Sequence, residues 1–269
     1  MTSLIAWTGV DSRGPASIYL ASDSRISWEN RGTWDFSRKL FASTSYPDIL
    51  GYFGDVLFSS QVLGQVVDLI DAQSLFTADA EPESKFAAIT LVFRQAYLTY
   101  PEIARHPFSI FHCSRRGEGM AARFALFELS WDLTTGWQNK AIPVSSERSA
   151  LVVARSSGEE SVLKCLARWD RSEVGRTSRS IFSAFCDALA SGADAKSGGA
   201  PQLVGIYREG SAKSFGVIHK GNRYLHGLCV DSSPWLGSVE WRNELFERCD
   251  WRTREKLDSA QRQPRPRRL

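Results

Sequence analysis

The sequence predicts an α+β fold in which antiparallel sheets are layered with helices on the outside. Apolar runs of strand length come in hairpin-like pairs, helical segments also come in pairs, and the regular β–α–β alternation of Rossmann and TIM-barrel folds is missing. The chain has 269 residues, of which 43% are hydrophobic and 23% charged, as in an ordinary globular domain. A wholly disordered chain, a collagen-like fibre and a coiled-coil rod are therefore excluded.

The first strands are expected near the N-terminus. Residues 3–8 and 16–22 are short β-like runs around a turn rich in Gly, Asp and Ser, which predicts a hairpin with a long loop. Two further strands are expected at 38–43 and 49–53, on either side of a Tyr46-Pro47-Asp48 turn.

Two helices are expected next. Apolar residues at helical spacing run from Ser59 to about Gln73, and Ser59 or Ser60 can cap the start. A second helix is predicted over 81–97, because Pro82 occupies the first turn and apolar residues follow it.

The second half repeats the order of strands and paired helices. The expected elements are strands at 109–113, 122–131 and 150–154, helices at 159–169 and 177–190, strands at 202–207, 214–219 and 224–230, and a last amphipathic helix at 238–249.

The C-terminal segment has a different composition. Residues 252–269 carry seven basic and two acidic side chains, a net charge of +5, which leaves −2 for residues 1–251 given the total of +3. Such a segment buries too little apolar surface to offset its ordering entropy. We therefore expect one domain over 1–251 and a basic disordered tail over 252–269, with nucleic acid an unfavoured partner.

No feature of the sequence indicates a membrane, a metal or a cofactor. The apolar runs are shorter than a membrane helix needs, and the first residues lack the basic start of a signal peptide, so a cytoplasmic protein is expected. The five cysteines form no CxxC pair, and the four histidines lack metal-ligand spacing.

The N-terminus carries the first chemical hypothesis. Initiator methionine is usually removed when a small residue follows it, and Thr2 is small. Removal of Met1 would place a hydroxyl nucleophile and a free α-amine, which titrates near neutral pH, on one residue. Taken alone, Thr2 is more simply the second residue of an ordinary protein.

A second motif gives this hypothesis its context. Asp23-Ser24-Arg25 ends the second predicted strand, and Lys39 follows Asp23 by sixteen residues. With Thr2, this arrangement resembles the proteasome β-subunit family and its bacterial HslV-like and Anbu-like relatives. The resemblance implies that Thr2 is the nucleophile, that Lys39 lowers the proton affinity near its hydroxyl, and that Asp23 holds Lys39 in an ion pair. Arg25 is expected near the site in a structural role.

Further matches to the family lie downstream. Ser157 ends a strand before a helix, and Asp194 and Ser197 lie in an Asp-x-x-Ser-Gly stretch thirty-seven residues after Ser157. The resemblance implies that these three residues orient the N-terminal amine and complete a proton relay. Gly54, before the first long helix, matches the family's oxyanion-hole glycine, although a plain turn glycine is an equal alternative.

Taken together, the resemblance implies a four-layer αββα sandwich, the N-terminal-nucleophile (Ntn) hydrolase fold, with threonine peptidase activity and no cofactor or metal. Its expected partners are further copies of the chain in a ring, a peptide or protein substrate, and an ATP-dependent unfoldase. Two alternatives remain open: a catalytically idle proteasome-like scaffold subunit, and a small-molecule amidase on the same fold. Residues 100–148 and those beyond 230 match nothing in the family, which leaves the substrate undefined.

Overall fold

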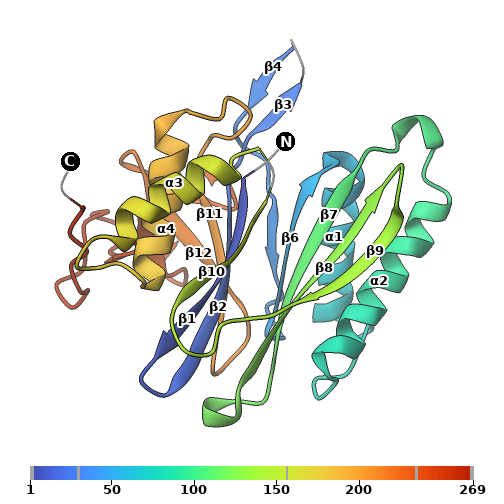
Figure 1. Cartoon of the computed structure of the whole chain (residues 1–269), viewed down its shortest axis with the longest axis horizontal. Helices are drawn as coiled ribbons and strands as arrows, with labels where there is room; N and C mark the ends of the chain where they lie inside the picture. The colour runs from blue at the N-terminus through green and yellow to red at the C-terminus, as the bar shows by residue number, and fades with distance from the viewer. Residues whose placement is uncertain (1–2, 29–30, 156, 234–235, 267–269) are drawn as a thin grey trace.

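The computed structural model describes residues 3–28, 31–155, 157–233 and 236–266. Two large sheets lie face to face between two pairs of helices (Figure 1). The predicted four-layer αββα sandwich is thereby confirmed.

The first sheet has nine strands and contains the N-terminal hairpin. Its main path runs β10-β1-β2-β11-β12-β13-β14, and β15 and β16 extend it beside β12. The strands are β1 (Leu4–Asp11), β2 (Gly14–Ser22), β10 (Ala150–Arg155), β11 (Gln202–Tyr207), β12 (Lys213–His219), β13 (Asn222–Leu225), β14 (Leu228–Cys229), β15 (Trp241–Asn243) and β16 (Arg248–Cys249). All of its pairings are antiparallel except that of β12 with β15.

The second sheet has five strands and is antiparallel throughout, in sequence order β5-β6-β7-β8-β9. The strands are β5 (Leu40–Ala42), β6 (Asp48–Gly54), β7 (Phe108–Arg116), β8 (Arg123–Asp132) and β9 (Gly136–Ile142). A separate hairpin of β3 (Ile26–Trp28) and β4 (Gly32–Trp34) projects from the domain (Figure 1).

Each sheet has its own pair of helices on its outer face (Figure 1). Helices α1 (Val56–Asp71) and α2 (Pro82–Leu98) cover the five-stranded sheet, and α3 (Glu159–Asp170) and α4 (Ser178–Ser191) cover the nine-stranded sheet. Short 3-10 turns occupy Glu102–Ala104 and Gly119–Ala121.

Strand β1 shows how the sequence builds these layers. Leu4 and Ala6 pack between the two sheets, whereas Ile5 and Trp7 pack toward α4. This alternation follows from the period of two in a strand. Trp7 is fully buried and stacks on Tyr19 with ring centroids 4.9 Å apart, so it belongs to the core.

The single strand expected at 224–230 is instead a tight hairpin of β13 and β14, because His226 and Gly227 turn the chain with φ of 53° and 83°. The other predicted elements agree with the observed ones within a few residues, with four exceptions. Helix α1 begins at Val56, before Ser59, because Asp55 caps it by accepting a hydrogen bond from the Leu57 amide at 3.2 Å. The hairpin β3–β4 and strand β9 were not predicted, since both are short or largely exposed and lack apolar alternation.

The fourth exception is the helix expected at 238–249, which is wrong. This segment forms the short strands β15 and β16 instead. Phe246 adopts a left-handed conformation with φ of 61°, which interrupts a right-handed helix, and Asn243 Oδ1 accepts hydrogen bonds from the amides of Leu245 and Glu247 in the intervening turn.

The segment after Trp251 lies against the domain as far as it is described. Gln263 is buried, and its backbone N–H donates a 2.6 Å hydrogen bond to Glu247 Oε1. Arg265 pairs with Asp187 on α4. The boundary at residue 251 and the disorder of the residues beyond it stay predictions. No helix in the described ranges is long and apolar enough to cross a membrane.

Candidate active site

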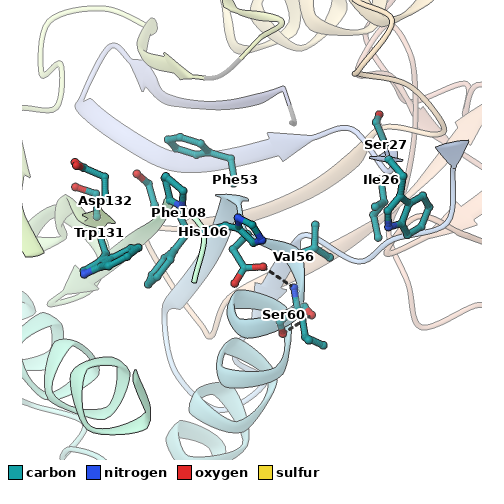
Figure 2. A pocket seen from close by; sticks show the side chains of 16 residues that line it. Ile26, Ser27, Phe53, Val56, Ser60, His106, Phe108, Trp131 and Asp132 are labelled. Carbon is teal, nitrogen blue, oxygen red and sulfur yellow. Dashed lines mark hydrogen bonds between the residues drawn. The ribbon is translucent and has the colours of Figure 1, made fainter. Parts of the chain in front are cut away.

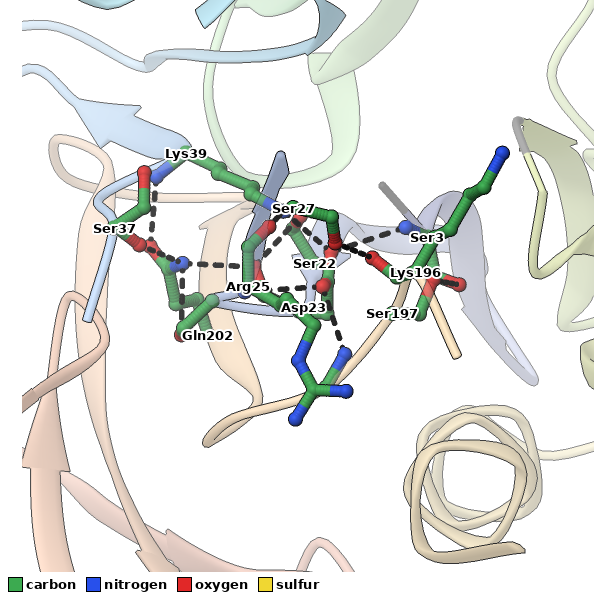
Figure 3. Close-up of polar contacts among 12 residues, drawn as sticks. Ser3, Ser22, Asp23, Arg25, Ser27, Ser37, Lys39, Lys196, Ser197 and Gln202 are labelled. Carbon is green, nitrogen blue, oxygen red and sulfur yellow. Dashed lines mark hydrogen bonds and ion pairs between the residues drawn. The ribbon is translucent and has the colours of Figure 1, made fainter. Parts of the chain in front are cut away.

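Asp23 lies at the end of β2 and is fully buried. Its Oδ1 accepts hydrogen bonds from Lys39 Nζ at 2.8 Å and from the Ser3 amide at 3.0 Å. Its Oδ2 accepts from the amides of Arg25 at 3.1 Å and Gly198 at 3.0 Å (Figure 3). Four donors therefore converge on one buried carboxylate.

Lys39 lies just before β5, and its side chain is as buried as that of Asp23. Its ammonium donates to Asp23 and, at 2.5 Å, to the carbonyl oxygen of Arg25 (Figure 3). Burial lowers the pKa of Lys39, and the neighbouring Asp23 carboxylate opposes this effect without cancelling it. The sixteen-residue spacing therefore corresponds to a real ion pair in the interior.

Gln202, the first residue of β11, holds the backbone around this pair. Its side-chain oxygen accepts a hydrogen bond from the Lys39 amide at 3.0 Å. Its Nε2 donates to the carbonyls of Asp23 at 3.0 Å and Ser37 at 2.8 Å (Figure 3). Gln202 was not among the predicted site residues, since no local motif marks a lone Gln at the start of a strand.

A second polar cluster forms around Asp194, between α4 and β11. Asp194 Oδ2 accepts hydrogen bonds from the hydroxyls of Ser157 and Ser197, both at 2.6 Å, and Oδ1 accepts from the Lys196 amide at 3.0 Å. Burial raises the pKa of Asp194, but the hydrogen bonds from Ser157 and Ser197 outweigh it, so the pKa lies below its usual value.

Ser3 joins the two clusters. Its amide donates to Asp23, and its hydroxyl lies 2.7 Å from the Ser197 hydroxyl (Figure 3). Gly158 leaves room for it, since a Cβ at residue 158 would lie 1.7 Å from Ser3 Oγ. Ser3 was not among the predicted site residues, although its place directly after Thr2 is a signal that could have identified it.

Arg25 fixes the loops beside the ion pair. Its guanidinium makes a bidentate pair with Asp35, at 2.7 and 2.9 Å, and donates to the carbonyl of Ala195. A Cβ on Gly198 would lie 2.5 Å from this guanidinium, so Arg25 and the glycine pack closely together. The Ala195 contact ties the end of β2 to the loop that carries Ser197.

Gly54 ends β6, two residues beyond Tyr52, whose amide donates to the Lys39 carbonyl at 3.3 Å. It has φ of 95°, and a Cβ there would lie 2.3 Å from the Pro107 carbonyl oxygen, so only glycine fits. It lines a cleft that also contains Ile26 and Ser27 (Figure 2).

The structure thus brings Asp23, Lys39, Ser157, Asp194 and Ser197 into one hydrogen-bonded network through Ser3, and Gly54 into a neighbouring cleft. Thr2 lies outside the described residues. Within those residues, no group of three or more His, Cys, Asp or Glu side chains is arranged to hold a metal ion.

Comparison of the whole fold with solved structures finds proteins of similar fold. The Anbu complex from Pseudomonas aeruginosa, described as a helical assembly, matches with a TM-score of 0.56 and 14% identity over 82% of this chain and 86% of that chain. The fold is that of a proteasome β-subunit. The eukaryotic HslV from Trypanosoma brucei also matches, at 14% identity over 76% of this chain and 99% of that chain, with a TM-score of 0.46. No protein-family model and no curated protein matches the chain.

The two alignments bear on fold alone at this identity. The Anbu alignment supports the predicted resemblance to the fold of proteasome β-subunits and the predicted four-layer αββα sandwich. The roles of the site residues rest on the geometry of this chain.

Proposed function

We propose that the protein is an N-terminal threonine hydrolase that cleaves amide bonds in peptides. The observation that carries this proposal is the buried Asp23–Lys39 pair, because Asp23 also binds the amide of Ser3. Ser3 directly follows Thr2 in the sequence. Thr2 is therefore covalently joined to a residue whose amide shares one carboxylate oxygen with the Lys39 ammonium.

The chemistry follows from these groups. After removal of Met1, the Thr2 hydroxyl attacks the substrate carbonyl, and the α-amine of Thr2 accepts the hydroxyl proton. The ammonium of Lys39 stabilises the developing alkoxide, and the Gly54 amide is the proposed donor to the oxyanion. The tetrahedral intermediate then collapses with cleavage of the C–N bond, and the protonated α-amine gives its proton to the departing amine, which leaves an acyl-threonine ester. Water attacks this ester while the α-amine takes a proton from it, and the return of that proton to the Thr2 oxygen releases the carboxylic acid and restores the free hydroxyl.

The Asp194 cluster has a supporting role in this proposal. A carboxylate that accepts from Ser157 and Ser197 is a strong hydrogen-bond acceptor near Ser3. We assign Ser157, Asp194 and Ser197 to the orientation of the N-terminal amine and the relay of its proton. No step of the proposed reaction uses a cofactor.

Assembly and partners extend the proposal. The Anbu complex is described as a helical assembly, and we propose that this chain also forms a homo-oligomer, with an ATP-dependent unfoldase as a partner in the cytoplasm. Light scattering on purified protein gives the mass of the assembly, and co-purification tests the unfoldase.

The deciding experiment combines intact mass with turnover of a fluorogenic peptide amide. Active protein should be lighter than the encoded chain by one methionine. Thr2→Ala should abolish turnover, and Thr2→Ser, which keeps a hydroxyl, should retain part of it. Active protein that retains Met1 would refute the mechanism. Processed protein without turnover on any peptide or small amide would favour the idle scaffold, and turnover of small amides alone would favour the amidase.

A further inference from the structure

The cleft beside Gly54 has a volume of about 1160 Å³. It opens between the β3 strand, the start of α1 and the ends of β7 and β8 (Figure 2). Four aromatic side chains form much of its wall: Trp28, Phe53, Phe108 and Trp131. A cleft of this size holds a complete amino-acid side chain with room for adjoining groups.

The cleft adjoins the candidate active site. Ser27 lines it, and the Ser27 hydroxyl donates to the carbonyl of Lys196, next to Ser197, at 3.2 Å. Ile26 also lines it, directly after Arg25, whose carbonyl accepts from Lys39 Nζ. A side chain bound in the cleft would therefore lie beside the buried ion pair.

The Asp, Glu, Lys and Arg side chains that line the cleft are all acidic. Of its 16 lining residues, Asp55 and Asp132 are acidic, and none is a lysine or an arginine. Hydrogen bonds from Thr134 and Thr135 lower the pKa of Asp132, so it stays ionised at neutral pH. His106, the remaining titratable side chain of the cleft, is exposed.

Asp55 has an unused acceptor. Its Oδ1 accepts from the Leu57 amide, but its buried Oδ2 has no hydrogen-bond partner among the described residues. Burial raises the pKa of Asp55, and the Leu57 hydrogen bond only partly opposes this. A buried carboxylate oxygen without a donor is unfavourable, and a cationic donor would relieve that cost.

The aromatic walls favour the same kind of ligand. The faces of tryptophan and phenylalanine attract a guanidinium or ammonium group, and they also cover the apolar stem of an arginine or lysine. An acidic ligand would meet two carboxylates, and a purely apolar ligand would leave Asp55 Oδ2 without a partner.

We infer that the cleft binds a basic side chain of the substrate, arginine or lysine, with its cation at Asp55 and its stem against the aromatic walls. This inference rests on the proposed hydrolase function, because it names the residue next to the amide that Thr2 would attack. Asp55 is then the specificity-determining residue.

The test uses two reporter amides that differ only in charge. Arginine and its neutral isostere citrulline are compared, each on the same fluorogenic leaving group. Wild-type protein should show kcat/KM about tenfold or more higher for arginine, as expected for one charged hydrogen bond. Asp55→Asn should bring this ratio close to one. Asparagine caps a helix as well as aspartate does, so α1 should remain intact, and the melting temperature checks it.

A control variant separates the local effect from net charge. Asp79→Asn removes the same charge from an exposed loop position outside the cleft, and the arginine preference should persist in it. A wild-type ratio near one, or a ratio that survives Asp55→Asn, would overturn the inference while leaving the hydrolase proposal intact.

If no reporter is cleaved, the hydrolase proposal fails. The binding of arginine amide to the cleft then tests the inferred site without catalysis. Arginine amide is then titrated into wild-type protein and Asp55→Asn by calorimetry. Binding that weakens about tenfold or more in Asp55→Asn supports the site. Absent binding, or equal binding to both proteins, overturns it.

Discussion

Ser3 Oγ lies 2.7 Å from Ser197 Oγ, and this contact has a defined direction. Ser197 donates its single hydroxyl proton to Asp194 at 2.6 Å, so Ser3 must be the donor to Ser197. The amide of Ser3 donates to Asp23 at the same time. Both carboxylates of the candidate site therefore hold the residue that follows Thr2.

Ser197→Ala tests the role of the Ser197 hydroxyl, which connects Ser3 to Asp194 by hydrogen bonds. The change leaves the Ser3 hydroxyl without its acceptor and removes one donor from Asp194, whose Ser157 bond remains. We expect turnover to fall about tenfold or more, with stability reduced by about 1–3 kcal/mol. Turnover is measured on a reporter amide and stability by urea unfolding. Ser74→Ala, at an exposed serine in the turn after α1, is the matched control and should change neither. Unchanged turnover in Ser197→Ala would remove Ser197 from the site.

Gly158→Ala tests the space beside Ser3. The new Cβ would lie 1.7 Å from Ser3 Oγ and 3.3 Å from Ser197 Oγ, so Ser3 must shift. We expect turnover to fall at least about tenfold, because displacement of the nucleophile's neighbour by ~1 Å disturbs the reacting geometry. Gly64→Ala is the control: a Cβ there meets only Phe41 at 4.0 Å, and it should stabilise α1 by up to about 1 kcal/mol. Normal turnover in Gly158→Ala would show that the Ser3 position is not critical.

Lys39→Met tests the buried cation. It leaves the Asp23 carboxylate buried without its ammonium, which should cost about 3–5 kcal/mol of stability. Turnover should fall at least about 10²-fold, measured at a temperature where the variant is folded. The double variant Asp23→Asn/Lys39→Met removes both charges. It should recover only part of the stability, because the asparagine nitrogen then faces a backbone N–H donor, and it should not recover turnover. Near-normal turnover in either protein would contradict the proposed role of Lys39.

Short-range patterns explain which parts of the fold could be predicted. The alternation in β1, the first-turn proline of α2 and the spacing from Asp23 to Lys39 all lie within a few dozen residues of sequence. Gln202 could not be found in this way. It reaches Asp23 only because β11 pairs with β2, which places Gln202 opposite Ser22 across the sheet.

The error at 238–249 has a related cause. The apolar spacing there resembles a helix, but Trp241 is buried because β15 pairs with β12, a contact between segments about two dozen residues apart. Tertiary pairing overrides local propensity in such short segments. The cleft at Asp55 was also missed, because its walls come from four separate stretches of the chain.

The environment of the Asp48 carboxylate leads us to expect that the folded protein loses stability at low pH. This carboxylate is fully buried. Its Oδ2 accepts a hydrogen bond from Lys85 Nζ at 2.9 Å, and its Oδ1 lies 2.8 Å from His112 Nε2. Burial raises the pKa of Asp48, but His112 and Lys85 outweigh it, so the folded pKa is below the unfolded value near 3.9. Its stabilising contribution is present above pH ~4 and is lost as the pH falls further. Urea unfolding of wild type and Asp48→Asn should therefore show a large difference at pH 6 that narrows below pH ~4; an equal difference at both would contradict this.

Truncation after Trp251 tests the division of the chain. Every proposed catalytic residue precedes Gly199, so turnover of a reporter amide should persist in the folded truncated protein.

The described part of the segment nevertheless contacts the domain, since Gln263 is buried against Glu247 and Arg265 pairs with Asp187. Loss of the Gln263 hydrogen bond to the buried Glu247 should lower stability by about 1–3 kcal/mol, seen as a lower melting temperature. The control is full-length Arg262→Ala, which removes positive charge from the segment but keeps the Gln263 contact and should melt like the wild type. Loss of turnover in folded truncated protein would make residues 252–269 part of the catalytic unit, and an unchanged melting temperature would mean that the Gln263 contact adds no stability.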